Sequence, residues 1–290
     1  CGRTFQNIRQ RAGRMAQFSH FQSPRAGASR GGYTVLMMNI YIHQHPDFAL
    51  GNFIQCTPTI RRLAEYYYQP IPVLFSTKYV RQCFLDCPFI KIIDDANGLT
   101  RLFGSDLVNP NNDKPDYEYI FQEVLKEKWT PEFHTYVDEV PMQPTHAILR
   151  SKKIVVINGS GTENPDYVKS KDPGEYEYRA LLSLAIIRHR LMVRVVTTGS
   201  RADAKRNPYL LDICDECNFG NIRTSLAHIA TADLVIANDT GLAHAAGALN
   251  KNLLVLWKDT PRDRCKNPGI NTRYVYHMHR QAIIEEINKL

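Results

Sequence analysis

Two apolar runs separated by a stretch of small residues constrain the fold of this chain most strongly. Residues 233–238 (DLVIAN) and 252–257 (NLLVLW) are continuous apolar runs, which is typical of strands buried on both faces of a sheet. The connecting stretch, GLAHAAGAL at 241–249, is rich in alanine and has the length of a short helix. A strand, a helix and a second strand in that order predict two parallel strands joined by a crossover.

The same alternation runs through most of the chain. We expect strands at 33–42, 71–77, 89–94, 152–160, 192–200, 233–238 and 252–257, and helices at 59–68, 78–85, 119–129, 175–191, 225–232 and 241–249. This order predicts an α/β protein with two tandem Rossmann-like domains and parallel sheets. We place a basic leader at 1–32, an N-terminal domain at 33–145 and a C-terminal domain at 146–290, because the stretch around residue 145 has the prolines and charges of a linker.

The first helix of the N-terminal domain has a recognisable start signal. Thr57 is a favourable N-cap residue, and Pro58 fits the first helical position. We therefore expect residues 43–52 to form a loop after the first strand, with Pro46 and Gly51 as turn residues.

The positive charge of the chain is concentrated in its leader. The formal net charge is +7, and residues 1–32 contain six arginines with no lysine and no acidic residue. The rest is close to neutral, so we expect no nucleic-acid partner. A disordered arm is the favoured interpretation of the leader; an organelle transit peptide, a nucleic-acid-binding arm and an untranslated extension before a start at Met37 or Met38 are the alternatives.

The seven cysteines do not predict a disulfide framework in a chain of 290 residues. Cys83 with Cys87 and Cys214 with Cys217 form two short-spaced pairs, and together they could hold zinc. Neither pair lies in a zinc-ribbon-like segment. We therefore expect reduced, mostly buried thiols and no metal site.

A polar cluster follows the predicted strand at 233–238. In a parallel sheet, ligands bind at the carboxyl ends of strands, beside the following helix N-termini. Thr240 can cap that helix or donate its hydroxyl to an anion, and Gly241 allows a ligand to approach the backbone closely. A helix N-terminus favours phosphate. A structural capped helix with an incidental histidine, His244, is the alternative.

The string DTGLAHAAGAL at 239–249 resembles the donor-binding signature of glycosyltransferase family 9, the lipopolysaccharide heptosyltransferases. SLAHIATADLVIANDTG and VVTTGSRADA are similar to the segments before that signature, and ALGNFIQCTPTIRRLAEYY is similar to the family's first loop and helix. The resemblance covers roughly residues 33–95 and 152–260. It implies the two-Rossmann-domain (GT-B) fold, with the donor at the C-terminal domain and the acceptor at the N-terminal one.

The resemblance also implies roles for individual residues. Asp239 would contact the donor sugar, while Thr240, Gly241 and His244 would bind the diphosphate, and Leu242 belongs to the same donor-binding string. The family's diphosphate lysine corresponds to Lys171, with Lys169 as second choice, although the tryptophan that follows it in the family is absent here.

The implied reaction is an inverting, metal-independent displacement at the anomeric carbon, with no cofactor beyond the nucleotide-sugar donor, an ADP-sugar being favoured. No D-x-D tripeptide occurs in the chain, which agrees with that expectation. The reaction needs a base, and the family's aspartate is Asn52 here, which cannot remove a proton. Asp47 is our first choice for a substitute base, with His43 and His45 beside it in the same loop.

Three functions remain open from the sequence. The first is an active transferase that moves a sugar, with heptose favoured, to a glycan or lipid-linked acceptor. The second is a catalytically inactive transferase-like domain that serves as a binding or scaffold subunit. A nucleotide-sugar epimerase is third. We expect a cytoplasmic protein that contacts the membrane at most peripherally, with organelle import through the leader as the alternative.

Overall fold

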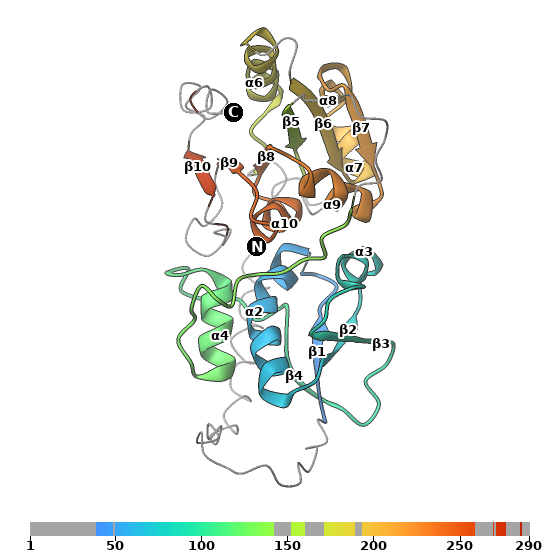
Figure 1. Cartoon of the computed structure of the whole chain (residues 1–290), viewed down its shortest axis with the longest axis vertical. Coiled ribbons are helices and arrows are strands. Elements are labelled where there is room, and N and C mark those ends of the chain that lie inside the picture. The colour runs from blue at the N-terminus through green and yellow to red at the C-terminus, as the bar shows by residue number, and fades with distance from the viewer. Residues whose placement is uncertain are drawn as a thin grey trace, which may run out of the picture. The chain divides into compact units, whose positions relative to one another are not determined.

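The computed structural model describes residues 39–48, 50–141, 152–159, 171–188, 193–258, 269, 271–276 and 285. The predicted leader at 1–32 and the predicted domain boundary at 145/146 lie outside these residues. Within them, the strands form two separate sheets, and every strand pairing is parallel (Figure 1).

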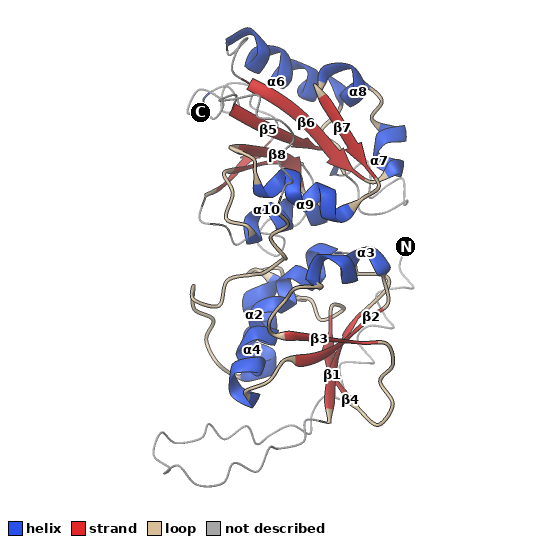
Figure 2. Ribbon diagram, turned by 45° about the vertical axis from the view of Figure 1, so that its right-hand side comes forward, coloured by secondary structure: helices blue, strands red, loops and turns tan. Residues whose placement is uncertain are grey.

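The first sheet has four strands in the order β3-β2-β1-β4. The strands are β1 (Ile40–Gln44), β2 (Ile71–Phe75), β3 (Ile90–Ile93) and β4 (Thr100–Gly104), and the helices are α2 (Leu50–Tyr67), α3 (Lys78–Arg81), the 3-10 helix η2 (Gln82–Phe84) and α4 (Asp116–Leu125). Helices α2 and α4 lie side by side, as Figure 2 shows. Buried residues of α2 such as Phe53, Ile54 and Ile60 pack with the sheet residues Ile42 and Val73 in one core.

The second sheet has six strands in the order β10-β9-β8-β5-β6-β7. The strands are β5 (Lys152–Ile157), β6 (Val193–Gly199), β7 (Glu216–Phe219), β8 (Leu234–Asn238), β9 (Leu253–Trp257) and β10 (Thr272–Tyr276), and the helices are α6 (Glu175–Arg188), α7 (Arg201–Arg206), α8 (Tyr209–Ile213), α9 (Ile222–Ala230) and α10 (Gly241–Ala248). This is the strand order of a doubly wound Rossmann fold, whose switch point lies between β5 and β8. The predicted fold class is confirmed.

The central strands of the second sheet are buried on both faces. Ile154 and Val156 of β5 pack in one apolar cluster, while the alternate residues Val155 and Ile157 pack in another on the opposite face. Burial on both sides explains why the sequence of such a strand is an unbroken apolar run without polar alternation.

The predicted start of the first helix is wrong. Helix α2 begins at Leu50, so Thr57 and Pro58 lie in its interior. A proline cannot donate to the carbonyl four residues earlier, which here is that of Ile54. The Thr57 hydroxyl donates to this same carbonyl at 2.6 Å, so the hydrogen bond that Pro58 cannot make is replaced by a side chain. The earlier start also moves Asn52 from the predicted loop into the first turn of the helix.

The Thr57 hydroxyl is fully buried and also accepts a hydrogen bond from the backbone N–H of Tyr136 at 2.8 Å. We predict that Thr57→Val lowers the free energy of unfolding by about 1–3 kcal/mol, because it leaves two buried backbone groups unpaired. Thr59→Val is the matched control, since the equally buried Thr59 hydroxyl has no partner among the described residues. Chemical denaturation of both variants tests this, and equal losses would contradict it.

A chain of polar side chains joins β5, α9 and β7, and its central members Lys153 and His228 are buried. The Lys153 Nζ lies 3.0 Å from the His228 Nδ1 and donates to the Thr231 hydroxyl at 2.8 Å, and the His228 Nε2 lies 3.2 Å from a Glu216 carboxylate oxygen. Burial lowers the pKa of Lys153 to about 8, although the Glu216 charge opposes that change. Burial, followed by the Lys153 charge, also lowers the pKa of His228. A neutral His228 can therefore accept at Nδ1 and donate from Nε2 to Glu216.

The lowered pKa of Lys153 predicts a particular pH dependence of stability. Between about pH 8 and the ordinary lysine pKa of 10.5, the unfolded chain binds a proton that the folded chain does not bind, so Lys153 contributes increasing stability as the pH rises. We predict that the wild type gains stability relative to Lys153→Met across this window and not below it. Denaturation of both proteins from pH 7 to pH 10.5 checks this, and parallel curves would contradict it.

Candidate functional site

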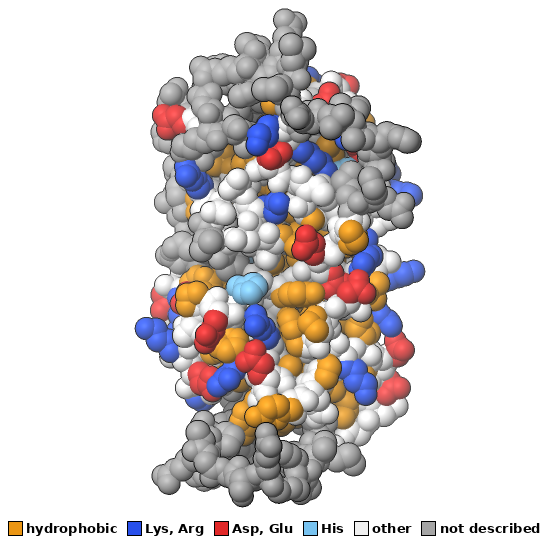
Figure 3. Space-filling view, viewed as in Figure 1, with side chains coloured by type: hydrophobic (Ala, Val, Ile, Leu, Met, Phe, Trp, Pro, Cys, Tyr) orange, Lys and Arg blue, Asp and Glu red, His pale blue; other side chains and the backbone are white. Residues whose placement is uncertain are grey.

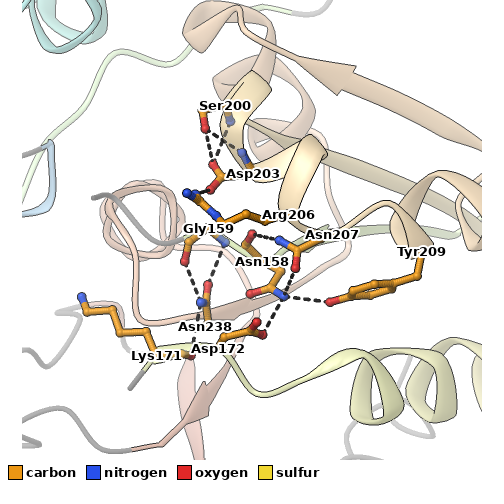
Figure 4. A network of polar contacts seen from close by, with 10 residues as sticks. All are labelled: Asn158, Gly159, Lys171, Asp172, Ser200, Asp203, Arg206, Asn207, Tyr209 and Asn238. Carbon is orange, nitrogen blue, oxygen red and sulfur yellow. Dashed lines mark hydrogen bonds and ion pairs between the residues drawn. The ribbon is translucent and has the colours of Figure 1, made fainter. Parts of the chain in front are cut away.

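Polar residues gather at the carboxyl ends of β5 and β8, which flank the switch point of the second sheet. The Asn238 side chain accepts from the backbone N–H of Gly159 at 3.0 Å and donates to the Gly159 carbonyl at 2.6 Å. These reciprocal bonds join the ends of the two strands (Figure 4). Ligands of doubly wound folds bind at this edge, so the structure places the predicted polar cluster where a ligand is expected.

Helix α10 begins at this edge as predicted. Thr240 has extended backbone geometry, and its side chain caps the helix by accepting from the Ala243 N–H at 3.4 Å. The other N–H groups of the first turn have no helical acceptor, which gives the helix end its affinity for anions. Gly159 permits the close approach of β5, because a Cβ atom there would lie 3.2 Å from the Thr240 methyl group.

Three charged or titratable side chains from the predicted donor-binding set lie together. The Lys171 Nζ lies 2.9 Å from the Asp239 Oδ2 and also donates to the Asp239 backbone carbonyl at 3.0 Å. On the other side, the His244 Nε2 lies 3.7 Å from the Asp239 Oδ1. All three residues are buried, so each charge depends on its neighbours for stabilisation. Lys169, the second choice for the diphosphate lysine, lies outside the described residues.

The pKa of Asp239 reports this environment. Burial alone would raise it, but the neighbouring His244 ring and the positive charge of Lys171 together hold the pKa of Asp239 well below its ordinary value. Asp239 is therefore ionised at any physiological pH. The His244 Nδ1 is also buried and has no hydrogen-bond partner within the part of the chain that the structure describes, so it is available to a ligand.

Helix α10 also packs against α2, and both helices belong to one compact unit of the chain, Met38–Leu290. A Cβ atom at Gly51 would lie 2.7 Å from the His244 Cδ2, and one at Gly241 would lie 3.0 Å from the Leu50 Cβ. The glycine at 241 thus allows the approach of α2. Asn52 follows Gly51 directly and is half-buried, so the position predicted for the family's base is adjacent to a residue that touches His244.

The candidate substitutes for the base lie at the end of β1. Asp47 is on an exposed turn, with 82% of its side chain accessible, and its carboxylate lies 3.7 Å from the His45 Nδ1. The His43 Nε2 lies 2.8 Å from the Ser76 hydroxyl. Burial, then the charges of Arg101 and His45, lowers the pKa of His43. None of the contacts found among the described residues joins Asp47 to the Asp239 cluster.

The residues around Asn158, after β5, support the site and could not be recognised in the sequence. Asn158 lies within hydrogen-bond distance of Asp172, Asn207 and Tyr209, at 3.0, 3.1 and 2.8 Å. These partners are between 14 and 51 positions away in the chain, so no local pattern connects them. Another missed feature had a local signal: Ser200 and Asp203 form a capping box at the start of α7, and its S-x-x-D spacing is visible in the sequence (Figure 4).

The described cysteines are free thiols. Cys56, Cys83 and Cys87 are buried, Cys214 is half-buried and Cys217 is exposed. Burial raises the pKa of Cys87 and Cys214 to about 12, so both stay protonated. Across the described ranges, no three histidine, cysteine, aspartate or glutamate side chains lie close enough together to hold a metal ion.

The surface carries mixed charge on the face drawn in Figure 3, where Lys and Arg side chains alternate with Asp and Glu. Among the described residues of that face, the basic side chains do not form a continuous patch. Among the described helices, none combines the length and the apolar character needed to cross a membrane.

Two parallel Rossmann-like sheets define the two-domain (GT-B) glycosyltransferase class of fold. The family model of glycosyltransferase family 9 (heptosyltransferase) matches residues 119–286, which is more than half of the chain. The chain belongs to this family. No curated protein sequence matches it.

Solved structures of bacterial family members share the fold. ADP-heptose lipopolysaccharide heptosyltransferase II of E. coli superposes with a TM-score of 0.65 at 15% identity, covering 87% of this chain and 98% of that one. The E. coli heptosyltransferase WaaC with ADP gives 0.63 at 12% identity, covering 87% and 99%. A family 9 glycosyltransferase of Veillonella parvula gives 0.61 at 13% identity, covering 88% and 90%.

The buried pair of Lys171 and Asp239 leads to a prediction about stability. Lys171→Met should lower the free energy of unfolding by about 3–5 kcal/mol, because it leaves the Asp239 carboxylate buried without its main counter-charge. Adding Asp239→Asn should restore part of this loss. Lys152→Met is the matched control, since Lys152 forms an exposed pair with Asp233 at 3.4 Å and should cost less than about 1 kcal/mol. Equal losses for the two lysines, measured by chemical denaturation, would contradict this account.

Proposed function

We propose that this chain binds a nucleotide-diphosphate sugar, with an ADP-sugar favoured, and transfers the sugar to a glycan or lipid-linked acceptor. The observation that carries this proposal is the buried cluster of Lys171, Asp239 and His244 at the N-terminus of α10. A structural helix cap does not need a buried ion pair and a histidine with an unused ring nitrogen. A ligand that brings both negative charge and hydroxyl groups uses all three side chains.

Each part of the cluster fits one part of the donor. The first-turn amides of α10, including that of Gly241, and the Thr240 hydroxyl would bind the diphosphate, a contact that contributes about 0.3–2 kcal/mol. Lys171 would stabilise the negative charge that develops on the departing nucleotide diphosphate. Asp239 accepts hydrogen bonds only, because it is ionised, and so it suits the hydroxyls of the sugar.

His244 has a role of its own in this proposal. Its Nε2 faces Asp239, while its Nδ1 is buried and unpaired among the described groups. When Nδ1 carries the second proton of the ring, the imidazolium donates to a phosphate oxygen. The paired Asp239 stabilises that charged form. Leu242 follows Gly241 in the first turn of α10, where its backbone N–H is another donor for the diphosphate.

The names of the similar structures support the choice of donor and acceptor. One is an ADP-heptose lipopolysaccharide heptosyltransferase, and another was solved with ADP. We propose ADP-heptose and lipopolysaccharide as the first substrates to test, with direct displacement and inversion at the anomeric carbon. The stabilisation of the leaving group described above uses only a helix N-terminus and side chains of the protein.

The weakest step of the proposed reaction is the removal of the acceptor proton. Asn52 lies in the first turn of α2, next to the Gly51 that contacts His244, and it can orient an acceptor hydroxyl by hydrogen bonds. It cannot take the proton. We propose Asp47 as the substitute base, which requires its exposed turn to close over the acceptor. If no group serves, the chain is a donor-binding subunit without transferase activity, and the replacement of the family's aspartate by Asn52 supports this second candidate.

Titration calorimetry with ADP-, UDP- and GDP-sugars tests donor binding. We expect one nucleotide sugar to bind, and Asp239→Asn to weaken that binding at least tenfold, the loss that follows from about 1.4 kcal/mol. Asp233→Asn is the matched control at the opposite end of β8, where Asp233 accepts from the Lys153 N–H. Failure of the wild type to bind any nucleotide sugar would refute the proposal.

Restoring a carboxylate at position 52 tests the account of the base. We predict that Asn52→Asp raises the rate of ADP release from ADP-heptose, in the presence of heptose-deficient lipopolysaccharide, by about 10²–10⁴ if the wild type lacks a base. If Asp47 serves instead, Asp47→Asn lowers the wild-type rate by a similar factor. A rate unchanged by both substitutions would show that neither position handles the proton.

A further inference from the structure

Lys258 lies at the carboxyl edge of the second sheet, directly after β9. In the sheet, Asn238 at the end of β8 pairs with Leu256 of β9. Lys258 is two residues after Leu256, so it lies beyond the end of β8 and level with the start of α10. Its Nζ donates to the backbone carbonyl of Asp172 at 3.1 Å, in a half-buried position. The lysine therefore reaches from the end of β9 to the residue that follows Lys171.

The short segment Lys171–Gly174 is held at several points by the ends of three strands. The Asn238 side chain of β8 donates to the Lys171 carbonyl at 3.3 Å, and Asn158, after β5, lies 3.0 Å from the Asp172 carboxylate. That carboxylate also accepts from the Gly174 N–H at 2.9 Å. Lys258 supplies the contact from β9, so each of the three neighbouring strands β5, β8 and β9 fixes the segment.

This arrangement matters because of what the segment carries. Lys171 reaches Asp239 from this segment, and both of its contacts with Asp239 are close to 3 Å. A shift of the backbone by a fraction of that distance would separate the buried charges. The rigidity of the supporting groups determines how well a charged group is placed for its ligand.

We propose that Lys258 is a positioning residue: it holds the Lys171–Gly174 segment so that the Lys171 ammonium meets the diphosphate of the donor. The proposal rests on the proposed donor-binding function for its ligand, but its structural part does not. Lys258 donates to the Asp172 carbonyl, and through that bond it restricts the segment whether or not a nucleotide is present.

Lys251 offers a matched control within the same half of the chain. It precedes β9, whereas Lys258 follows it, and its Nζ also donates to a backbone carbonyl, that of Ala230, at 2.9 Å. Lys258→Met and Lys251→Met both remove a positive charge and a hydrogen bond to a backbone carbonyl, at opposite ends of one strand. Lys258→Arg keeps the charge and a donor at the site.

Hydrogen exchange of the full chain without ligand tests the structural part. We expect peptides that contain residues 171–175 to exchange at least several-fold faster in Lys258→Met than in the wild type, and to be unchanged in Lys251→Met. Unchanged exchange in Lys258→Met would overturn the proposal. This outcome does not depend on any nucleotide, so it decides whether Lys258 holds the segment even if no donor binds.

Affinity for ADP tests the functional part. We expect Lys258→Met to weaken ADP binding about tenfold, the effect of losing one hydrogen bond from a charged donor, with Lys258→Arg restoring most of it and Lys251→Met having no effect. The loss should persist at high salt, because a purely electrostatic effect of the missing charge would shrink with screening. An ADP affinity unchanged by Lys258→Met, in a wild type that binds ADP, would overturn the proposal, whereas a wild type that binds no nucleotide would refute the proposed function itself.

Discussion

The carboxylate of Asp239 is buried at the switch point of the second sheet, and neighbouring side chains must compensate its negative charge. Taking a carboxylate out of water costs several kcal/mol unless opposite charge and hydrogen bonds replace the water. Lys171 and His244 supply that compensation from opposite sides. Asn238, one residue before Asp239, forms two hydrogen bonds with the backbone of Gly159. These bonds hold the end of β8, where Asp239 lies, against the end of β5.

A pair of this kind suits a site that binds and releases a charged ligand. Without a donor, Lys171 is neutralised by Asp239 and does not remain as an unpaired buried charge. When a diphosphate is bound, the ammonium can share its charge between the carboxylate and the phosphate oxygens, and Asp239 keeps its negative charge because its pKa is held low. The proposed donor would thus meet positive charge at its phosphate and a hydrogen-bond acceptor at its sugar.

The sequence predicted the central strands, the edge strand β3 and the donor string, but not the other edge strands or the supporting contacts. β5, β8 and β9 are unbroken apolar runs because both their faces are buried, whereas the missed strands β4, β7 and β10 are edge strands with polar residues among their apolar ones. Thr57-Pro58 led to a wrong prediction of the helix start. Inside a helix, a threonine hydroxyl can donate a hydrogen bond to the carbonyl that the proline leaves without a donor. The residues from Asp239 to His244 are contiguous and could be recognised. The bonds of Asn158 and Lys258 join distant parts of the chain, and only the folded structure shows them.

The chain keeps the residues proposed to bind the donor, but it has Asn52 at the position that the resemblance assigns to the family's base. The proposed function depends on diphosphate binding at the N-terminus of α10 beside Lys171. A crystal structure with ADP-heptose, or with the nucleotide sugar that binds best, would show where the diphosphate lies. We expect phosphate oxygens within hydrogen-bond distance of the first-turn amides of α10 and of the Lys171 Nζ, with a sugar hydroxyl on Asp239. The proposal would be contradicted by a nucleotide that binds elsewhere, makes no contact with the Lys171–Asp239 pair and leaves that pair unchanged.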